Sequence, residues 1–164
     1  MEKHPELDQD YEFIVQDISF PEMPIIYIPL TLTHEEMLDT GQYFMKLGIY
    51  AFSVDGKPTG RSFKRILNQT ETHIELECCF EMEATVPEGE GVFSKVLPAI
   101  DGKFAGTRHI GNRGDLPKAY VKMYEWFKTQ DLARTGEPLI EFYPNNKHMV
   151  PVAELITDIL WPVK

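Results

Sequence analysis

The segment of residues 74–82 constrains the fold most strongly, because its side chains alternate between apolar and polar. Positions 74, 76, 78, 80 and 82 carry Ile, Leu, Cys, Phe and Met, and three of the four positions between them carry Glu. A period of two is typical of a strand with one buried face. We therefore expect a sheet with one packed face and one acidic face.

The order of strand and helix patterns in the first half of the chain recurs in the second half. The patterns predict strands at about residues 11–15, 23–30, 62–67 and 74–82, then at 92–97, 103–110, 139–143 and 154–160. They indicate an α+β fold with duplicated βαββ halves, at about residues 11–86 and 91–164, forming one antiparallel sheet. Two helices are expected on one face, which leaves a ligand groove on the other. Residues 1–10 form a polar leader before this single domain.

Capping signals place the two helices. Thr33 and Glu36 have the capping-box spacing, so the first helix is expected to begin there and to stop near Gly48. Residues 51–54 are then expected to be extended. The second helix is expected over residues 116–130, with Asp115 as its cap and Pro117 in its first turn.

Charge and composition exclude several classes of function. The chain has 26 acidic and 16 basic residues and a formal net charge of −10, which disfavours direct binding to nucleic acid or to anionic lipid. Many proteins are acidic for colloidal reasons alone. No stretch approaches the roughly 18 apolar residues of a membrane span, so we expect a cytoplasmic protein that does not bind membranes.

Neither cysteine nor histidine suggests a covalent or metal framework. Cys78 and Cys79 are adjacent in a predicted strand, so their side chains point to opposite faces and no disulfide between them is expected. The five histidines do not have metal-ligand spacing. We therefore expect no metal and no cofactor.

A series of short motifs in the second half resembles the GyrI-like family. The motifs, in order, are His109-Ile110-Gly111, Ala119-Tyr120, Trp126-Phe127, Gly136-Glu137-Pro138, Glu141-Phe142-Tyr143 and residues 157–163. The family includes drug-sensing domains of transcription activators, gyrase-inhibitory proteins and a branch that resembles hydrolases of cyclopropane-bearing genotoxins. The resemblance implies a duplicated βαββ fold. The activators carry an amino-terminal DNA-binding unit, which ten residues before Tyr11 cannot supply, so a stand-alone domain is expected.

The resemblance also implies a ligand groove at Glu141. It places the Glu141 carboxylate in the groove, with Tyr143 on the same face. Where the family commonly has Gly-Pro-Tyr after the histidine, this chain has Gly111-Asn112-Arg113, which removes an aromatic residue and adds a positive charge. A partly hydrated carboxylate among aromatic rings attracts organic cations. The candidate ligand-binding residues are Glu141, Tyr143, Trp126, Tyr27, Tyr50, Phe80, Glu77 and His109.

Several interpretations of these residues stay open. The favoured function is binding of a lipophilic, cationic drug or toxin without turnover. An alternative is a hydrolase of electrophilic genotoxins, in which Glu141 and Tyr143 act with Glu77 as a second carboxylate. Another is a gyrase-inhibitor-like protein whose acidic face engages a protein partner. Trp126 is also typical of a helix packed on the core, Glu141 of a solvated strand, and His109 of a structural hydrogen bond.

Overall fold

The computed structural model describes residues 10–164, which form two compact units. One unit is Ile18–Asp101, and the other combines residues 10–17 with Gly102–Lys164. The polar leader expected at residues 1–10 lies, except for Asp10, outside the described residues. None of the helices in residues 10–164 has the length and apolar character needed to cross a membrane.

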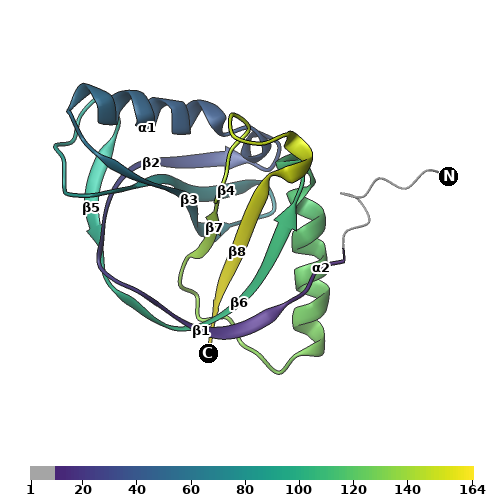
Figure 1. Ribbon diagram of the computed structural model, residues 1–164. Helices are drawn as coiled ribbons and strands as arrows, with labels where there is room; N and C mark the ends of the chain where they lie inside the picture. The colour runs from purple at the N-terminus through teal and green to yellow at the C-terminus, as the bar shows by residue number, and fades with distance from the viewer. Residues whose placement is uncertain (1–9) are drawn as a thin grey trace. The chain divides into compact units, whose positions relative to one another are not determined.

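The unit Ile18–Asp101 contains four antiparallel strands and one helix. Its elements are β2 (Met23–Thr33), a 3-10 turn (Glu36–Leu38), α1 (Gly41–Ser53), β3 (Pro58–Gln69), β4 (His73–Met82) and β5 (Phe93–Leu97). The strands lie in the order β5-β2-β4-β3. Figure 1 shows α1 lying along β2.

The core of this unit lies between α1 and one face of its strands. Leu47 and Ala51 of α1 are buried together with the side chains at even positions of β2 and β4, which include Ile26, Leu76 and Cys78. The side chains at odd positions point to the face without α1, where β4 carries glutamates. The strand predicted from the alternation at residues 74–82 is therefore confirmed.

The other unit has the same arrangement of elements. Its elements are β1 (Ile14–Phe20), β6 (Ile100–Ile110), a 3-10 turn (Arg113–Asp115), α2 (Leu116–Thr129), β7 (Leu139–Phe142), a 3-10 turn (Val152–Glu154) and β8 (Ile156–Val163). The strands lie in the order β1-β6-β8-β7, and α2 runs alongside β6 (Figure 1). Each unit thus contains one β-α-β-β repeat, β2-α1-β3-β4 or β6-α2-β7-β8, and one extra edge strand, β5 or β1. The paired strands of each repeat are antiparallel, so the predicted α+β fold of duplicated βαββ halves is confirmed.

The limits of α1 differ from the prediction. The capping box at Thr33 and Glu36 forms, with both of its hydrogen bonds, but it lies at the 3-10 turn Glu36–Leu38 and not at the start of α1. The predicted stop at Gly48 is wrong, because α1 runs on to Ser53, and the extended segment predicted for residues 51–54 is mostly helical. The helix ends where Asp55 takes a φ of +55° and the Gly56 amide donates to the Ala51 carbonyl at 2.8 Å.

Two strands are shifted along the chain relative to their predicted positions. The first strand is β1 at Ile14–Phe20 rather than residues 11–15, and the last is β8 at Ile156–Val163 rather than residues 154–160. Pro162 lies inside β8, opposite Phe104 of β6, with its carbonyl accepting from Thr135 at 3.2 Å. Proline is uncommon inside a central strand, yet β8 continues past residue 160 and through Pro162.

Candidate functional site

The Glu141 carboxylate is buried in β7 and receives hydrogen bonds from two tyrosines. Its side chain is 2% exposed. The Tyr143 hydroxyl donates to Oε1 at 2.7 Å, and the Tyr120 hydroxyl of α2 donates to Oε2. Glu141 pairs with Ile159 in β8, so it lies on the face of the strands that α2 covers. Both carboxylate oxygens are therefore held by neutral donors.

Tyr120 reaches Glu141 because it lies on the apolar stripe of α2. This stripe packs inward at Leu116, Ala119 and Met123, and the Tyr120 ring meets Trp161 of β8 edge-on with centroids 6.4 Å apart. Burial, followed by the charge of the neighbouring carboxylate, raises the pKa of Tyr120 well above its usual value near 10. Tyr120 therefore keeps its proton and acts as a hydrogen-bond donor to Glu141.

Arg113 brings a positive charge to the same site. Its guanidinium carbon lies 4.6 Å from the centroid of the Tyr143 ring. The side chain donates to Thr157 Oγ1 at 3.0 Å and to the carbonyls of Asn145 and Ile156 at 2.9 and 2.8 Å. Burial lowers the pKa of Arg113, and the charges of Tyr143 and Glu141 oppose that effect. Arg113 is thus fixed by neutral acceptors and by a ring face.

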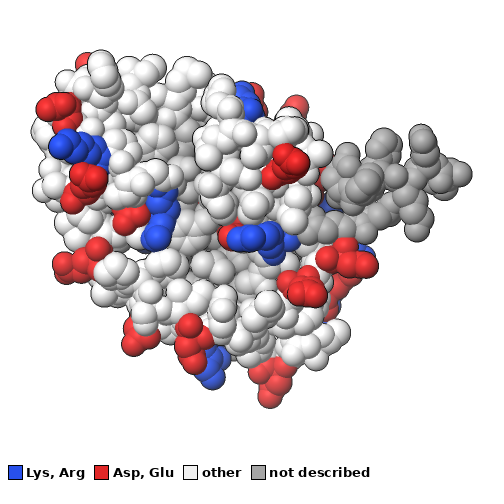
Figure 2. Space-filling model, viewed as in Figure 1, with Lys and Arg blue, Asp and Glu red and all other residues white. Residues whose placement is uncertain are grey.

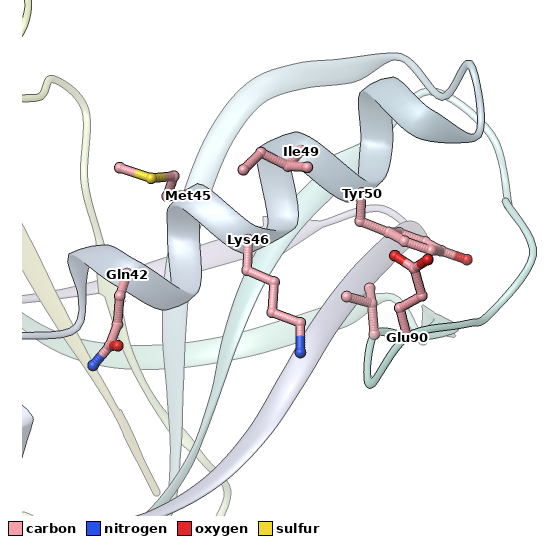
Figure 3. Close-up of a pocket in the computed structure, with 7 residues that line it drawn as sticks. Gln42, Met45, Lys46, Ile49, Tyr50 and Glu90 are labelled. Carbon is pink, nitrogen blue, oxygen red and sulfur yellow. The ribbon is translucent and has the colours of Figure 1, made fainter.

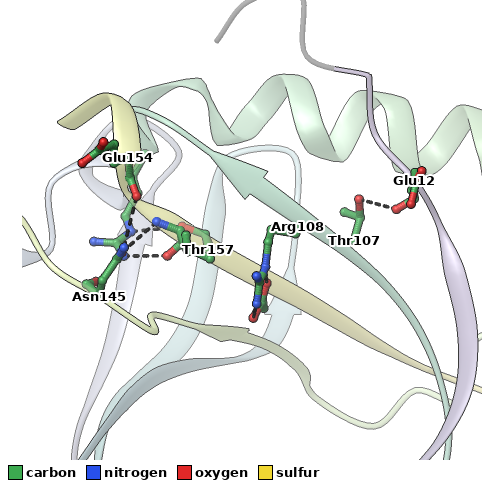
Figure 4. A network of polar contacts seen from close by, with 9 residues as sticks. Glu12, Thr107, Arg108, Asn145, Glu154 and Thr157 are labelled. Carbon is green, nitrogen blue, oxygen red and sulfur yellow. Dashed lines mark hydrogen bonds and ion pairs between the residues drawn. The ribbon is translucent and has the colours of Figure 1, made fainter. Parts of the chain in front are cut away.

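Asn145, whose carbonyl accepts from Arg113, is itself held by hydrogen bonds of its side chain. Figure 4 shows Asn145 and Thr157 joined in one polar network, in which the Asn145 side chain donates to the Glu154 carbonyl at 3.1 Å. In a separate contact in the same view, Thr107 donates to the Glu12 carbonyl at 2.8 Å. Arg113 therefore has partners that hold its guanidinium in place.

His109 and Trp126 lie in the same unit as Glu141, but each has its own neighbours. The His109 ring is completely buried, with Nε2 donating to the Asn112 carbonyl at 2.9 Å and Nδ1 lying 2.7 Å from the Tyr11 hydroxyl. Trp126 stacks on Phe13 at 5.2 Å between centroids. These contacts fit the structural interpretations of both residues.

A second buried glutamate, Glu77 in β4, lies in the other unit and is held by cations. Arg65 donates to its Oε1, and Lys95 Nζ lies 2.7 Å from its Oε2. The Lys95 ammonium also lies 4.1 Å from the centroid of Tyr27, whose pKa is raised by burial and by Glu77. Glu77 and Tyr27 therefore belong to one group, in which both carboxylate oxygens already have charged partners.

Glu77 and Glu141 do not occupy corresponding positions in the two halves. Glu77 lies in β4, the last strand of its half, on the face opposite α1. Glu141 lies in β7, the third element of the repeat β6-α2-β7-β8, on the face that α2 covers. Acidic alternation along a strand indicates the face on which a glutamate lies, but it does not indicate the place of that strand in its unit.

The remaining candidate residues, Tyr50 and Phe80, pack against the core around α1. Phe80 stacks on Phe44 with centroids 6.1 Å apart. Tyr50 donates to the Pro87 carbonyl and borders a pocket of about 180 Å³ between α1 and the loop of Glu90 (Figure 3). Ligand pockets for drug-sized molecules occupy roughly 300–1,000 Å³, so this pocket suits only a smaller group.

Tyr120 contacts Glu141 but is not among the candidate residues predicted from the sequence. It was present in the Ala119-Tyr120 motif and on the apolar stripe of α2. A tyrosine on a buried stripe needs a partner for its hydroxyl, and this requirement pointed toward a polar side chain across from α2. The identity of that side chain depends on the pairing of β7 with β8.

One face of the molecule shows how its charged side chains are arranged. On the face shown in Figure 2, acidic side chains are spread over the surface, with basic ones among them. Within residues 10–164, no group of three or more His, Cys, Asp and Glu side chains is arranged to hold a metal ion.

Comparison with known proteins gives a family and several structural relatives. The profile of the GyrI-like small molecule binding domain matches residues 15–164. No curated protein matches the sequence. The isolated C-terminal domain of EcmrR has a TM-score of 0.74 at 19% identity, covering 94% of this chain and 98% of that domain. Against EcmrR in its complex with DNA, the chain spans only 57% of that protein's length.

Two further solved structures have the same fold at lower identity. SAV2435 bound to tetraphenylphosphonium has a TM-score of 0.59 at 13% identity, covering 93% of this chain and 94% of that one. A hydrolase from Listeria innocua has a TM-score of 0.57 at 11% identity, covering 92% of this chain and 91% of that one. At these identities the likeness establishes the fold alone.

Proposed function

Because the chain belongs to the family of GyrI-like small-molecule-binding domains, we propose that it binds a lipophilic organic cation at Glu141. Glu141 would supply the negative charge. The aromatic rings of Tyr120, Tyr143 and Trp161 would supply flat apolar contacts. Arg113, over the Tyr143 ring, would limit how close the positive centre of the ligand can come.

The state of the Glu141 carboxylate is the observation that carries this proposal. It is buried, both oxygens accept from phenol hydroxyls, and among residues 10–164 no cationic group lies within ion-pair distance of it. Glu77, by contrast, already pairs with Arg65 and Lys95. A buried charge is stable only when it is paired or hydrogen-bonded, so Glu141 has more to gain from an added cation than Glu77.

The surrounding rings favour a bulky, flat-sided cation over a small hydrated one. Ring faces attract cations through their quadrupole, most strongly where water is excluded. SAV2435, which shares the fold, is known in complex with tetraphenylphosphonium, a cation that carries four phenyl groups. This compound is therefore a suitable first probe.

The proposal is tested by thermal-shift measurements with a cation and a neutral analogue of similar shape. A ligand that binds the native state raises its melting temperature by mass action. We expect tetraphenylphosphonium to stabilise the native chain and Glu141→Gln to abolish most of that shift. The Gln amide can still accept from one tyrosine, so the variant removes the charge with little change of shape.

Glu137→Gln is the matched control. Glu137 is an exposed residue in the turn before β7, so its substitution removes the same charge without touching the site. This control should respond to the cation like the native chain. Equal shifts for Glu141→Gln and the native chain would show that the cation binds elsewhere.

A second candidate function is hydrolysis at the same residues. The hydrogen bond from Tyr143 to Glu141 supports it, because the pair joins a carboxylate with a proton donor. Glu141 would take a proton from water as the hydroxyl adds to one carbon of a strained ring. The bond between that carbon and its neighbour would break, and Tyr143 would give its proton to the neighbouring carbon. The proton on Glu141 would then return to Tyr143 through their hydrogen bond. A product that has gained one water and disappears in both Glu141→Gln and Tyr143→Phe would support this function, and binding without turnover would exclude it.

A further inference from the structure

Three aromatic rings pack together close to the carboxyl end of α2, one of them nearly perpendicular to the other two. Together they form an open corner lined by their faces. Trp161 of β8 meets Tyr124 at 5.4 Å and Phe127 at 5.5 Å between centroids, with interplanar angles of 74° and 81°. Tyr124 and Phe127 are three residues apart in α2, so they lie side by side on one face of the helix. Tyr124 is 37% exposed, so the corner opens to solvent.

The guanidinium of Arg134 occupies this corner. Its central carbon lies 5.0 Å from the centroid of Trp161, 5.6 Å from that of Tyr124 and 5.8 Å from that of Phe127. Cation–π attraction acts within about 6 Å of a ring centroid, so all three rings contribute. No carboxylate in the described part of the chain lies within ion-pair distance of Arg134.

The side chain of Arg134 can leave the corner without moving its backbone. The amide of Thr135 donates to the Pro162 carbonyl at 3.2 Å, and the amide of Lys164 donates to the Ala133 carbonyl at 2.8 Å. These bonds fix the chain on both sides of Arg134, which itself is exposed. Rotation about its side-chain bonds is enough to empty the site.

We propose that Tyr124, Phe127 and Trp161 form a binding site for small organic cations of the quaternary ammonium class, and that Arg134 fills it as a tethered competitor. Rings set at right angles surround a rounded cation from several sides, whereas the flat guanidinium matches such a corner less completely. A tethered group acts at a high effective concentration. Free cations therefore bind only when they displace Arg134.

This inference goes beyond the proposed function, because the site does not use the Glu141 carboxylate. The two sites share the Trp161 ring, which contacts Tyr120 on the side of Glu141 and Tyr124 and Phe127 at the second site. The negative electrostatic potential at this second site comes from the faces of the aromatic rings and not from a carboxylate. Its ligands are therefore selected by shape and by a diffuse positive charge.

The test is a fluorescence titration with choline, with its neutral isostere 3,3-dimethylbutan-1-ol as control. Trp161 reports binding when Trp126, which stacks on Phe13 and meets Phe127 edge-on, is replaced by Phe in every protein used. Phe keeps an aromatic ring against Phe127. In this background we expect Arg134→Ala to bind choline at least tenfold more tightly than the parent. Arg134→Lys, which keeps a cation on the tether, should give a smaller gain.

Two further variants make the outcome decisive. Adding Tyr124→Leu to Arg134→Ala removes one exposed wall and should weaken choline binding at least tenfold. Adding Glu141→Gln to Arg134→Ala should leave choline affinity within twofold. The proposal is overturned if Arg134→Ala gains no affinity, if the neutral isostere binds as tightly, or if Glu141→Gln removes the binding, since that last result would assign the cation to Glu141.

Discussion

Glu141 and Glu77 are buried to a similar extent but have partners of different charge. Glu77 lies between a guanidinium and an ammonium, whereas Glu141 accepts from two phenol hydroxyls. A buried carboxylate that has lost water needs such donors, and an ionised acceptor forms stronger hydrogen bonds than a neutral one. The tyrosines therefore satisfy the hydrogen-bonding capacity of the Glu141 carboxylate without adding a positive charge.

Removal of the Tyr120 hydroxyl tests this description of Glu141. We expect Tyr120→Phe to destabilise the protein by about 1–3 kcal/mol, because it leaves a buried carboxylate oxygen without its donor. Urea unfolding measures the change. Tyr124→Phe, which removes a hydroxyl from an exposed ring on the same helix, should cost much less. If Tyr120→Phe costs less stability in a Glu141→Gln background, the difference measures the coupling between Tyr120 and Glu141. Equal losses of stability for Tyr120→Phe and Tyr124→Phe would contradict a stabilising hydrogen bond from Tyr120.

Cys79 illustrates a buried group without reactivity. Burial, reinforced by the nearby Glu77 charge, raises the pKa of the Cys79 thiol well above its usual value. Because the thiolate is the reactive form, we expect no reaction with a disulfide reagent such as Ellman's reagent in the folded protein. Both thiols should react fully in guanidinium. Rapid modification of Cys79 in the native state would mean that β4 opens locally.

At the scale of elements, the sequence predicted which segments are strands and helices better than where they end. The alternation at residues 74–82 matched β4 because it repeats over nine positions. Gly48 was predicted to end the helix because glycine is common at helix ends. However, Leu47, Tyr50 and Ala51 lie on the buried face of α1, and their packing extends the helix past Gly48. Packing outweighed the local signal, as tertiary contacts often do.

The close approach of β6 to β8 gives a prediction about glycine. A Cβ at Gly106 would lie 3.0 Å from Leu160 Cδ2 and 3.4 Å from the Ile159 carbonyl. We expect Gly106→Ala to cost about 1–3 kcal/mol, as overpacking usually does. Gly102, in the same strand, has no atom within 4 Å of a Cβ, so Gly102→Ala should be neutral in the same chemical denaturation experiment. Similar stabilities for the two variants would show that β6 can move away from β8.

Only part of the candidate site could be predicted from the sequence. Glu141 and Tyr143 were expected on one face, and they do form a hydrogen bond. Their contact with Tyr120 depends on the position of α2 over β7, which no periodicity specifies. Tyr27, Tyr50 and Phe80 were selected as aromatic residues, but residue type does not determine which face of a strand or helix carries them.

At the scale of the whole molecule, the buried tyrosines predict how stability depends on pH. The pKa of Tyr120 is raised well above 10 in the folded protein, and those of Tyr11 and Tyr27 are raised as well. Above about pH 10 the unfolded chain loses these protons while the folded chain keeps them, so stability falls as pH rises. We expect Tyr120→Phe to show a shallower fall from pH 9.5 to 11 in urea unfolding, and an unchanged slope would contradict the burial of Tyr120.

Selective binding of cations is the central claim about the molecule, and it depends on one buried charge in a chain that carries a net charge of −10. General attraction by that net charge would act on any cation and would weaken as salt screens it. An anchoring carboxylate at Glu141 would instead give a preference that survives added salt. The two explanations therefore differ in what Glu141→Gln should change.

Calorimetric titration of the native chain and Glu141→Gln with tetraphenylphosphonium and with neutral triphenylphosphine oxide tests this claim most directly. For the native chain we predict a preference for the cation that persists at raised sodium chloride. In Glu141→Gln the cation should lose at least tenfold in affinity, about 1.4 kcal/mol, while the neutral compound keeps its affinity within twofold. An unchanged cation preference in Glu141→Gln would contradict the account.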